Sequence, residues 1–597
     1  MEKTEEEGHT NYWMLGLFAL IVGVVTGCGA VVFRSLITIV HNILFYGEFS
    51  WVGQGNAFET PSAWGPLVIL VPVIGGMGVV FLVRTFAPEA KGHGVPEVMD
   101  AIYYREGRIR PVVAFVKSVA SALSIGSGAS VGREGPIIQI GASLGSTLGQ
   151  LARIPTWQRI TLVAAGAGAG IAATFNTPLG AVMFAIELMM PEFSTRTFLP
   201  VVVATGSATY IGRLAYGLDP AFAVPVLDPG FLHPIHLSTL AGFVVLGLLC
   251  GVAAWAFVRL LTAMEDYFEG SFWSKRPYLS HAVGMLVLGL MMYGLHLGFG
   301  HYFIDGVGYG TIQSILQGDM TWLGLLALLF VAKLVATTLS LGSGASGGVF
   351  SPSLFMGATL GAAFGALLLP MLPETEFTIP DFAVVGMASM VAAGTGAAMT
   401  AIVMIFEMTR DYNIIVPMIL AVSLGIGVRR LLSKENIYTI KLAWRGKRIP
   451  RERHSNMFLV RHAEEVMTRS ITVMPADKLL REAVEELHDL PEDKRITHII
   501  VDRDGHVGGV VALRQPMGDL QWAVGDTTLG EIGDDRYVLT RPDESMFVLF
   551  QRFSRGRAER ALVVRGEGVP RIDDVVGVIS KRLIADAVLK NFTAYST

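Results

Sequence analysis

The sequence predicts an all-α polytopic membrane domain with broken and re-entrant helices, followed by a cytosolic α/β region. The 597 residues are 52% hydrophobic and 16% charged, with a mean hydropathy of +0.52, too apolar for a soluble protein. Charge is uneven: between residues 321 and 373 only Lys333 is charged, whereas charged residues become frequent after about Arg445. The third observation is a repeat, because Gly126–Pro136 recurs as Gly342–Pro352 with seven of eleven positions identical. Two related halves with interrupted apolar segments are typical of repeat transporters, whose site lies where the repeats meet.

The chain divides into four parts by composition. We expect a cytosolic N-terminal tail at 1–11, a membrane domain at 12–442, a basic linker at 443–462 and a C-terminal α/β region at 463–597. The membrane domain has halves at about 12–216 and 237–442, and the C-terminal region has two small units at about 463–520 and 526–590. The first apolar run follows an acidic tail and is too long for a signal peptide, so we expect no cleavage. Arginines and lysines follow the last apolar segment and predict a cytoplasmic C-terminus by the positive-inside rule.

Apolar segments recur in order along both halves. In the first half they lie at about 12–45, 64–86, 111–125, 137–152, 158–173, 177–190 and 197–216. In the second half they lie at about 237–264, 280–299, 322–340, 353–370, 381–396, 398–409 and 414–432. Several are shorter than the roughly 20 residues that cross a bilayer, which indicates re-entrant or tilted helices.

The C-terminal region alternates short strand and helix patterns twice. Strand, helix, strand, strand is predicted at 471–473, 479–487, 497–501 and 507–513, and again at 537–539, 544–554, 561–564 and 575–579.

Three glycine loops each end in a proline that can start a helix: Gly92–Pro96, Gly132–Pro136 and Gly348–Pro352. If the loops converge, three positive helix ends and their free amides surround one point in a low-dielectric interior. An anion could exchange its water for these amides, whereas a cation could not. The alternative is that each loop is only a helix break needed for packing.

Glu134 stands at the start of one of these helices. A carboxylate there is itself an anion, so it can take the anion's place when ionised and leave when protonated. Ionisable groups inside a membrane are functional hypotheses by default. The alternative is an ion pair with its neighbour Arg133, although adjacent loop residues usually point apart.

These loops, in this order, resemble the signature loops of the CLC family of chloride channels and proton/chloride antiporters. Gly132–Pro136 and Gly348–Pro352 are similar to two of its motifs, Gly92–Pro96 lies where a third belongs, and residues 437–442 resemble the segment with its pore tyrosine. Residues 463–597 resemble the paired CBS domains that many members carry. The resemblance implies an inverted repeat, a homodimer with one pore per subunit in the cell membrane, and both termini in the cytoplasm.

The resemblance also implies roles for individual residues. Glu134 would be the gating glutamate. The implied anion contacts are His93, Gly94, Val349, Phe350 and Tyr438. The pore-lining loop residues would be Gly92, Pro96, Gly132, Arg133, Gly135, Pro136, Gly348, Ser351 and Pro352.

Two positions depart from the family's pattern. His93 stands where the family has a serine. The neutral imidazole would offer one N–H to the anion, and the protonated imidazole would add a full positive charge, so anion binding would depend on pH. Alternatively, the ring turns away from the anion and a backbone amide takes its place. Leu188 occupies the position of the inner proton-transfer glutamate, after Glu187. This favours a gated passive channel for chloride or a similar anion. The alternative is a proton-coupled antiporter, whose proton path would use Glu134, Glu187 and His93.

Other classes fit less well. A magnesium transporter would need several intramembrane carboxylates, and a metalloprotease would need a His-Glu-x-x-His helix that is absent from the sequence. We therefore expect no enzyme activity, no metal and no nucleic-acid partner. Adenine nucleotide at the CBS pair is doubtful, because Gln515 and Leu583 stand where an aspartate would hold the ribose and only Ser580 keeps a hydroxyl.

Overall fold

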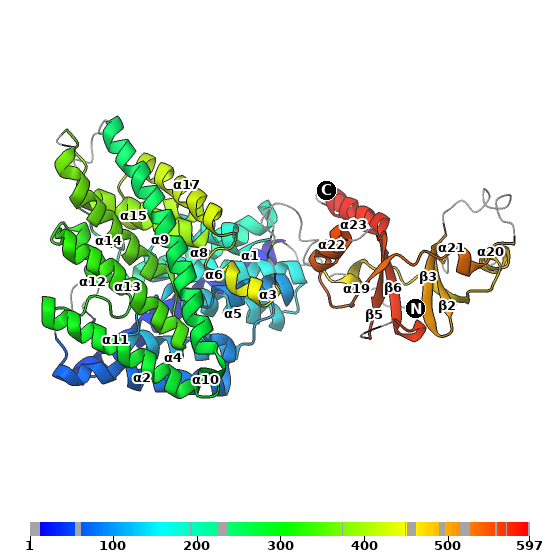
Figure 1. The fold of residues 1–597 in the computed structure, drawn as a ribbon, viewed down its shortest axis with the longest axis horizontal. Coiled ribbons are helices and arrows are strands. Elements are labelled where there is room, and N and C mark those ends of the chain that lie inside the picture. The colour runs from blue at the N-terminus through cyan, green and yellow to red at the C-terminus, as the bar shows by residue number, and fades with distance from the viewer. Residues whose placement is uncertain are drawn as a thin grey trace. The chain divides into compact units, whose positions relative to one another are not determined.

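The computed structural model describes residues 12–53, 61–191, 194–224, 236–372, 374–447, 449, 461–488, 496–513, 526–555, 558–566, 568 and 570–594. The chain divides into two compact units, Met1–Arg453 and His454–Thr597 (Figure 1). The N-terminal tail 1–11 and most of the basic linker lie outside the described residues.

The first unit is helical throughout its described part, as the sequence predicts. Its first half contains α1 (Tyr12–His41), α2 (Val71–Phe86), α3 (Val95–Tyr104), α4 (Val112–Gly126), α5 (Glu134–Leu151), α6 (Thr156–Phe175), α7 (Pro178–Phe184) and α8 (Thr195–Tyr216). Its second half contains α9 (Leu237–Glu269), α10 (Ser271–Ser274), α11 (Pro277–Phe299), α12 (Tyr309–Leu316), α13 (Leu323–Ser343), α14 (Phe350–Leu368), α15 (Ile379–Thr395), α16 (Ala398–Thr409) and α17 (Ile415–Leu432), and ends with α18 (Thr439–Trp444).

Among the described residues, 8 helices are long and apolar enough to cross a membrane. Four further apolar helices have only 10–17 residues, which confirms the expected mixture of spanning and shorter helices. The sequence analysis missed α12, because its eight residues carry Gly310, Thr311 and Gln313 and form no apolar run.

Small residues let the helices approach closely, and they do so at matching places in both halves. A Cβ added to Gly141 of α5 would lie 2.1 Å from the Gly166 carbonyl oxygen of α6. In the second half, a Cβ on Gly357 of α14 would lie 2.4 Å from the Gly386 carbonyl oxygen of α15. Backbone contact of this kind is how membrane helices associate without a hydrophobic driving force.

Two glutamates make matching contacts between the two halves. Glu187 follows α7 and accepts hydrogen bonds from the amides of Met399 (3.3 Å) and Thr400 (2.8 Å) at the start of α16. Glu407, near the end of α16, accepts the amides of Leu179 (3.1 Å) and Gly180 (2.7 Å) at the start of α7. A glutamate at the C-terminal end of each helix thus caps the N-terminal end of the other, which is possible because the two helices are antiparallel.

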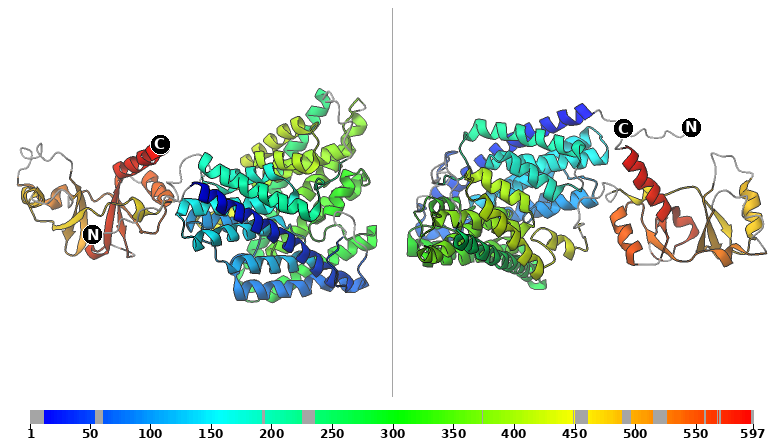
Figure 2. Two further views of the ribbon diagram at one scale, coloured as in Figure 1. Left: turned by 180° about the vertical axis from the view of Figure 1, so that it is seen from behind. Right: turned by 90° about the horizontal axis from the view of Figure 1, so that it is seen from above.

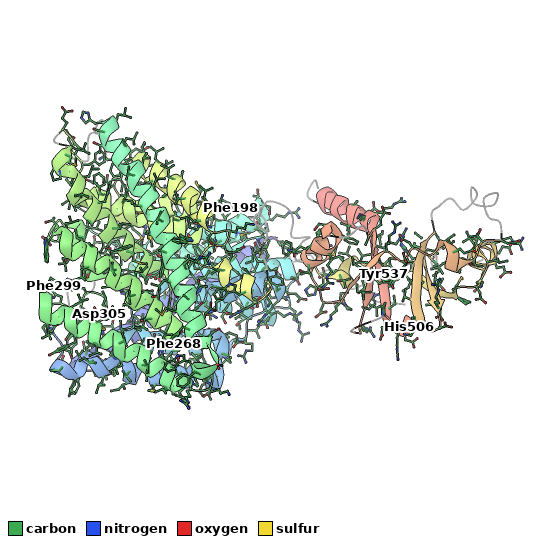
Figure 3. All side chains as sticks on the ribbon, viewed as in Figure 1. Phe198, Phe268, Phe299, Asp305, His506 and Tyr537 are labelled. Atoms are coloured by element: carbon green, nitrogen blue, oxygen red, sulfur yellow. The ribbon has the colours of Figure 1, made fainter. Side chains whose placement is uncertain are left out.

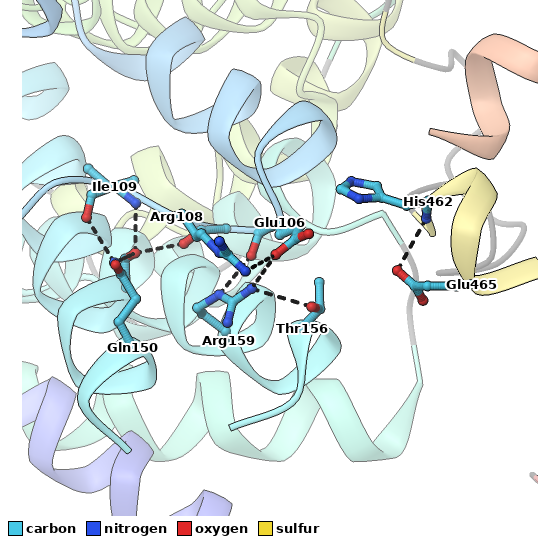
Figure 4. Close-up of polar contacts among 10 residues, drawn as sticks. Glu106, Arg108, Ile109, Gln150, Thr156, Arg159, His462 and Glu465 are labelled. Atoms are coloured by element: carbon cyan, nitrogen blue, oxygen red, sulfur yellow. Dashed lines mark hydrogen bonds and ion pairs between the residues drawn. The ribbon is translucent and has the colours of Figure 1, made fainter. Parts of the chain in front are cut away.

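The start of α6 is fixed by a polar cluster next to the end of α3 (Figure 4). Arg159 donates to the Glu106 carbonyl at 2.8 Å and pairs with its carboxylate at 3.0 Å. Arg108 pairs with the same carboxylate at 2.7 Å. The Gln150 side chain donates to the Ile109 carbonyl at 3.0 Å and joins α5 to this turn.

The C-terminal unit contains two three-stranded sheets of the same topology, so the predicted repeat of α/β units is confirmed (Figure 2). Their orders are β1-β2-β3 and β4-β5-β6, and in each the first pair is parallel and the second antiparallel. The strands are β1 (Ile471–Pro475), β2 (His498–Arg503), β3 (His506–Ala512), β4 (Tyr537–Thr540), β5 (Arg560–Val564) and β6 (Val575–Ser580). The helices are α19 (Ala463–Val466), α20 (Leu480–His488), α21 (Leu529–Ile532), α22 (Met546–Arg555) and α23 (Lys581–Ala594).

The two sheets share a small apolar core. Ile500 and Val510 of the first sheet pack with Leu562 and Val578 of the second. Ser580 accepts the Leu583 amide at 3.2 Å, so its hydroxyl is used at the start of α23. Gln515 lies outside the described residues, and the expectation of weak or no nucleotide binding stays a prediction.

The buried His498 makes the stability of this unit depend on pH. Burial lowers the pKa of His498 from 6.5 to about 4, and the nearby Arg560 acts in the same direction. The unfolded chain therefore takes up this proton at a higher pH than the folded unit does. Stability should fall as the pH drops below about 6.5, by about 1 kcal/mol at pH 5.5, and this loss should level off below pH 4.

Urea unfolding of residues 454–597 at pH 7.5 and pH 5.5 measures this difference. His498→Asn should reduce the change with pH, whereas His506→Asn, at an exposed site on the same sheet, should leave it (Figure 3). An equal pH dependence in the wild type and His498→Asn would refute the assignment to His498.

Candidate anion site

The three loops meet, and their backbones are hydrogen-bonded to each other. The Gly132 amide donates to the Gly348 carbonyl at 2.7 Å, and the Gly348 amide donates back to the Gly132 carbonyl at 2.6 Å. The Gly347 amide donates to the Gly92 carbonyl at 3.3 Å, which joins the third loop. The predicted convergence of α3, α5 and α14 at their starts is therefore present.

Glycine is required where the loops touch. A Cβ on Gly135 would lie 2.1 Å from the His93 carbonyl oxygen and 2.9 Å from the Gly348 Cα. Gly92 and Gly94 have φ values of +74° and +81°, which side chains rarely adopt. Pro96, Pro136 and Pro352 lie in the first turns of the three helices, where no amide is needed.

A fourth helix start, that of α12, belongs to the site and was missed from the sequence. Gly308 precedes α12 with φ of +76°, as Gly94 precedes α3. Lys117 Nζ donates to the carbonyls of Ala90 (2.9 Å) and Gly92 (2.7 Å) before α3. Lys333 Nζ donates to the carbonyls of Ile304 (2.9 Å) and Gly306 (3.0 Å) before α12.

The signal for this fourth loop was available in the sequence. Lys117 and Lys333 are 216 positions apart, the same separation as Gly126 and Gly342. Both lysines are completely buried. A charge buried this deeply must have partners, and in both halves these partners are the carbonyls of a loop.

Glu134 occupies the space between the helix starts. Its side chain is 1% exposed and accepts hydrogen bonds from the hydroxyls of Tyr309 and Ser351. The Ser351 amide, in the first turn of α14, donates to its other oxygen at 3.3 Å. The carboxylate thus lies at the positive end of α14, where an anion is stabilised.

The alternative ion pair between Glu134 and Arg133 is not found. The Arg133 guanidinium instead stacks over the Tyr309 ring at 5.0 Å and faces the Phe175 ring at 5.9 Å.

Val349 and Phe350 present main-chain amides at the start of α14. Val349 is the N-cap residue and Phe350 the first residue of the helix, so neither amide has an intrahelical acceptor. Both residues are buried. Next to the seat of Glu134 there are thus two more donors suited to an anion.

His93 and Tyr438 face each other on the other side of the loops. Their ring centroids are 5.9 Å apart, and the side chains are 2% and 1% exposed. In the described part of the chain, His93 Nδ1 has no hydrogen-bond partner. The His93 ring thus lies next to the Tyr438 ring.

Tyr438 is held from its backbone. The Asn436 carboxamide oxygen accepts the amides of Tyr438 (2.9 Å) and Thr439 (2.8 Å), and its nitrogen donates to the Thr395 carbonyl at 2.6 Å. Ion pairs between Lys441 and Glu265 (3.2 Å) and between Arg445 and Glu97 (2.8 Å) fix α18 against α9 and α3.

Glu187, a member of the predicted proton path, is bound elsewhere. Its carboxylate accepts the Thr400 hydroxyl at 2.8 Å as well as the two amides at the start of α16. This helix start is not among the four that meet at Glu134. Leu188 is 2% exposed in a π-helical turn, Ala185–Met189.

A cavity of about 700 Å³ leads toward Glu134 from the end of α1. Arg34, Arg133, Tyr216 and Tyr309 are among its lining residues, and Arg34 stacks over the Tyr216 ring at 4.1 Å. The loop before α12, marked by Asp305 in Figure 3, forms one wall. The cavity lies at the opposite end of α1 from the chain's N-terminus, and we call it the outer vestibule. Among the described residues no group of His, Cys, Asp and Glu could hold a metal ion.

This fold and site define a membrane transporter of small anions built from two related halves. The profile of the family described as "Voltage gated chloride channel" matches residues 75–430, and that of the CBS domain matches residues 463–515. The H(+)/Cl(-) exchange transporter ClcA of Salmonella arizonae is 33% identical over 439 residues, which cover 72% of this chain and 88% of that protein. The chain therefore belongs to the voltage-gated chloride channel (CLC) family.

Solved structures agree with this assignment. A slow cyanobacterial Cl−/H+ antiporter is 27% identical with a TM-score of 0.61, over 72% of this chain and 97% of that one. A eukaryotic CLC transporter is 19% identical with a TM-score of 0.59 over 95% of this chain and 97% of that one, a likeness of fold that extends through the C-terminal unit.

The close contact at Gly135 is directly testable. Gly135→Ala places a methyl group 2.1 Å from the His93 carbonyl oxygen, so the loops must separate. We expect at least a tenfold loss of anion flux per folded protein, or loss of folded protein. Gly206→Ala on α8, where nothing lies within 4 Å, is the matched control and should behave as wild type. Normal flux from Gly135→Ala in reconstituted vesicles would show that this contact does not position the site.

Proposed function

We propose that this protein exchanges chloride or a similar small anion for protons across the cell membrane, with Glu134 as the coupling carboxylate. The observation that carries the proposal is the seat of Glu134, where the Ser351 amide and two hydroxyls bind its carboxylate at the start of α14. The Salmonella relative and the cyanobacterial structure, both named as exchangers of H+ and Cl−, support exchange over the passive channel that Leu188 favoured.

The chemistry of the seat explains how one group can serve both ions. An ionised carboxylate only accepts hydrogen bonds, which suits the donors around Glu134. An anion needs the same donors, so it competes with the ionised carboxylate. Protonation removes the charge that the helix end stabilises and favours departure of the side chain. The alternation of proton and anion at one place is the basis of exchange.

We assign His93, Tyr438 and the amides of Val349 and Phe350 to the proposed anion path. The Glu187 carboxylate holds the start of α16, so we assign it a structural role in place of the proton path. The proposed proton path then consists of Glu134 and His93. The His93 carbonyl lies within contact distance of Gly135, the residue after Glu134.

A channel is the second candidate, and one observation favours it. Leu188 cannot carry a proton, and its side chain is 2% exposed. For either candidate we propose a homodimer with both termini in the cytoplasm. The basic residues after α17 support this orientation, and it makes the outer vestibule the external entry.

Opposing gradients of chloride and pH across reconstituted vesicles distinguish the two candidates. The exchanger should reverse its current at a voltage displaced from the chloride potential by the pH gradient. Glu134→Gln, which keeps the shape but cannot ionise, should still pass anions and should reverse at the chloride potential. A wild-type reversal at the chloride potential would establish the channel instead.

Selectivity should depend on His93. His93→Ser replaces the imidazole with a smaller hydroxyl next to Tyr438, so the ratio of chloride to nitrate flux should change by about threefold or more. We expect the flux to lose part of its pH dependence as well. Competition between the two anions in the vesicle assay measures the ratio. Unchanged selectivity and pH response would show that the ring does not contact the anion.

A further inference from the structure

We propose that the Tyr309 hydroxyl is a latch that holds the ionised Glu134 carboxylate in its seat and sets the pH at which the seat opens. The inference rests on the proposed role of Glu134 and adds a positioning residue that the sequence analysis did not contain. Tyr309 is 5% exposed and donates directly to Glu134 Oε1. Its oxygen is also 2.9 Å from the Ser351 hydroxyl oxygen, so the two hydroxyls bracket the carboxylate.

The latch is built on a rigid support. Tyr309 is the first residue of α12, and Gly308 before it has a positive φ and no room for a side chain, since a Cβ would lie 2.7 Å from Phe355. Lys333 fixes the preceding loop through the Ile304 and Gly306 carbonyls. The hydroxyl position is therefore set by backbone contacts, which favours a role in positioning.

The ring of Tyr309 is fixed as well. Phe222 meets it edge to face at 5.3 Å, and Phe175 packs at 6.3 Å. The Arg133 guanidinium covers it at 5.0 Å, and both Arg133 and Tyr309 line the outer vestibule. The hydroxyl thus lies between an aqueous cavity and a buried carboxylate, so that when Glu134 moves outward, this hydrogen bond must break.

Hydrogen bonds to a charged acceptor are stronger than those between neutral groups. The latch therefore stabilises the ionised, seated carboxylate more than the protonated one. Arg34, Arg133, Lys333 and Tyr438 also act electrostatically on Glu134 or on Tyr309. Removing only the phenol oxygen leaves these groups in place, so the seated, ionised carboxylate loses this one hydrogen bond alone.

Tyr309→Phe keeps the aromatic packing and removes the hydroxyl. In reconstituted vesicles, the pH of half-maximal anion flux should rise by about one unit, which corresponds to about 1.4 kcal/mol of lost stabilisation. Ser351→Ala, which removes the second hydroxyl, should also raise the pH of half-maximal anion flux. This variant replaces Tyr309→Phe as the test if Tyr309→Phe does not fold. Tyr293→Phe on α11, at a half-buried site outside the loops, is the control and should match wild type.

A double variant separates the latch from the proposed function. With Glu134→Gln in place the side chain in the seat cannot ionise, although its carboxamide oxygen can still accept a hydrogen bond. Adding Tyr309→Phe should therefore leave the pH dependence of flux unchanged. An unshifted profile in Tyr309→Phe, beside a flattened one in Glu134→Gln, would overturn the latch alone. A normal profile in Glu134→Gln would overturn the role of Glu134 itself. An effect of Tyr309→Phe of equal size in both backgrounds would assign Tyr309 to pore structure instead.

Discussion

The paired hydrogen bonds between Gly132 and Gly348 are the interaction on which the site depends. Inside a membrane, unsatisfied backbone groups are costly, so irregular chain is tolerated only where protein contacts or a cavity satisfy it. In each of the two loops, one backbone amide and one backbone carbonyl are hydrogen-bonded to the other loop. The helices that they start are left with first-turn amides next to Glu134, and these amides are the donors of the proposed anion site.

The two halves contribute unequally to that point, although they share a scaffold. Both use a buried lysine to hold a loop and a positive-φ glycine to begin a helix, as Lys117 with Gly94 and Lys333 with Gly308 show. The first half then supplies a carboxylate, Glu134, whereas the second supplies its donors. Under the proposed exchange, this shared scaffold with one carboxylate is what would let a proton and an anion use the same seat in turn.

The sequence was sufficient for what depends on local pattern. The helices follow from apolar runs, and the C-terminal sheets follow from alternating short segments. The meeting of the loops was inferred from the echo of Gly126–Pro136 at Gly342–Pro352. Hydropathy gives no signal for α12, because it is a short helix with polar residues; only the spacing of Lys117 and Lys333, equal to that of the repeat, points to the loop before it.

Contacts across the repeat were also beyond the sequence. Tyr309 reaches Glu134 over 175 positions of chain, and nothing in its surroundings marks it as polar or reactive. The resemblance places Glu187 on a possible proton path, because it matches the acidic residue that precedes the family's proton-transfer glutamate. In the structure its carboxylate accepts the amides of Met399 and Thr400 at the start of α16, a contact that only the placement of α16 shows.

The central claim is that the Glu134 carboxylate occupies a place that an anion takes when the carboxylate leaves. The most direct measurement is a structure of the Glu134→Gln protein with bromide, compared with the wild type under the same conditions. The account predicts a bromide anomalous peak at the Ser351 amide in the variant and none there in the wild type, where the carboxylate lies. A peak at that amide in both proteins, or in neither, would contradict it.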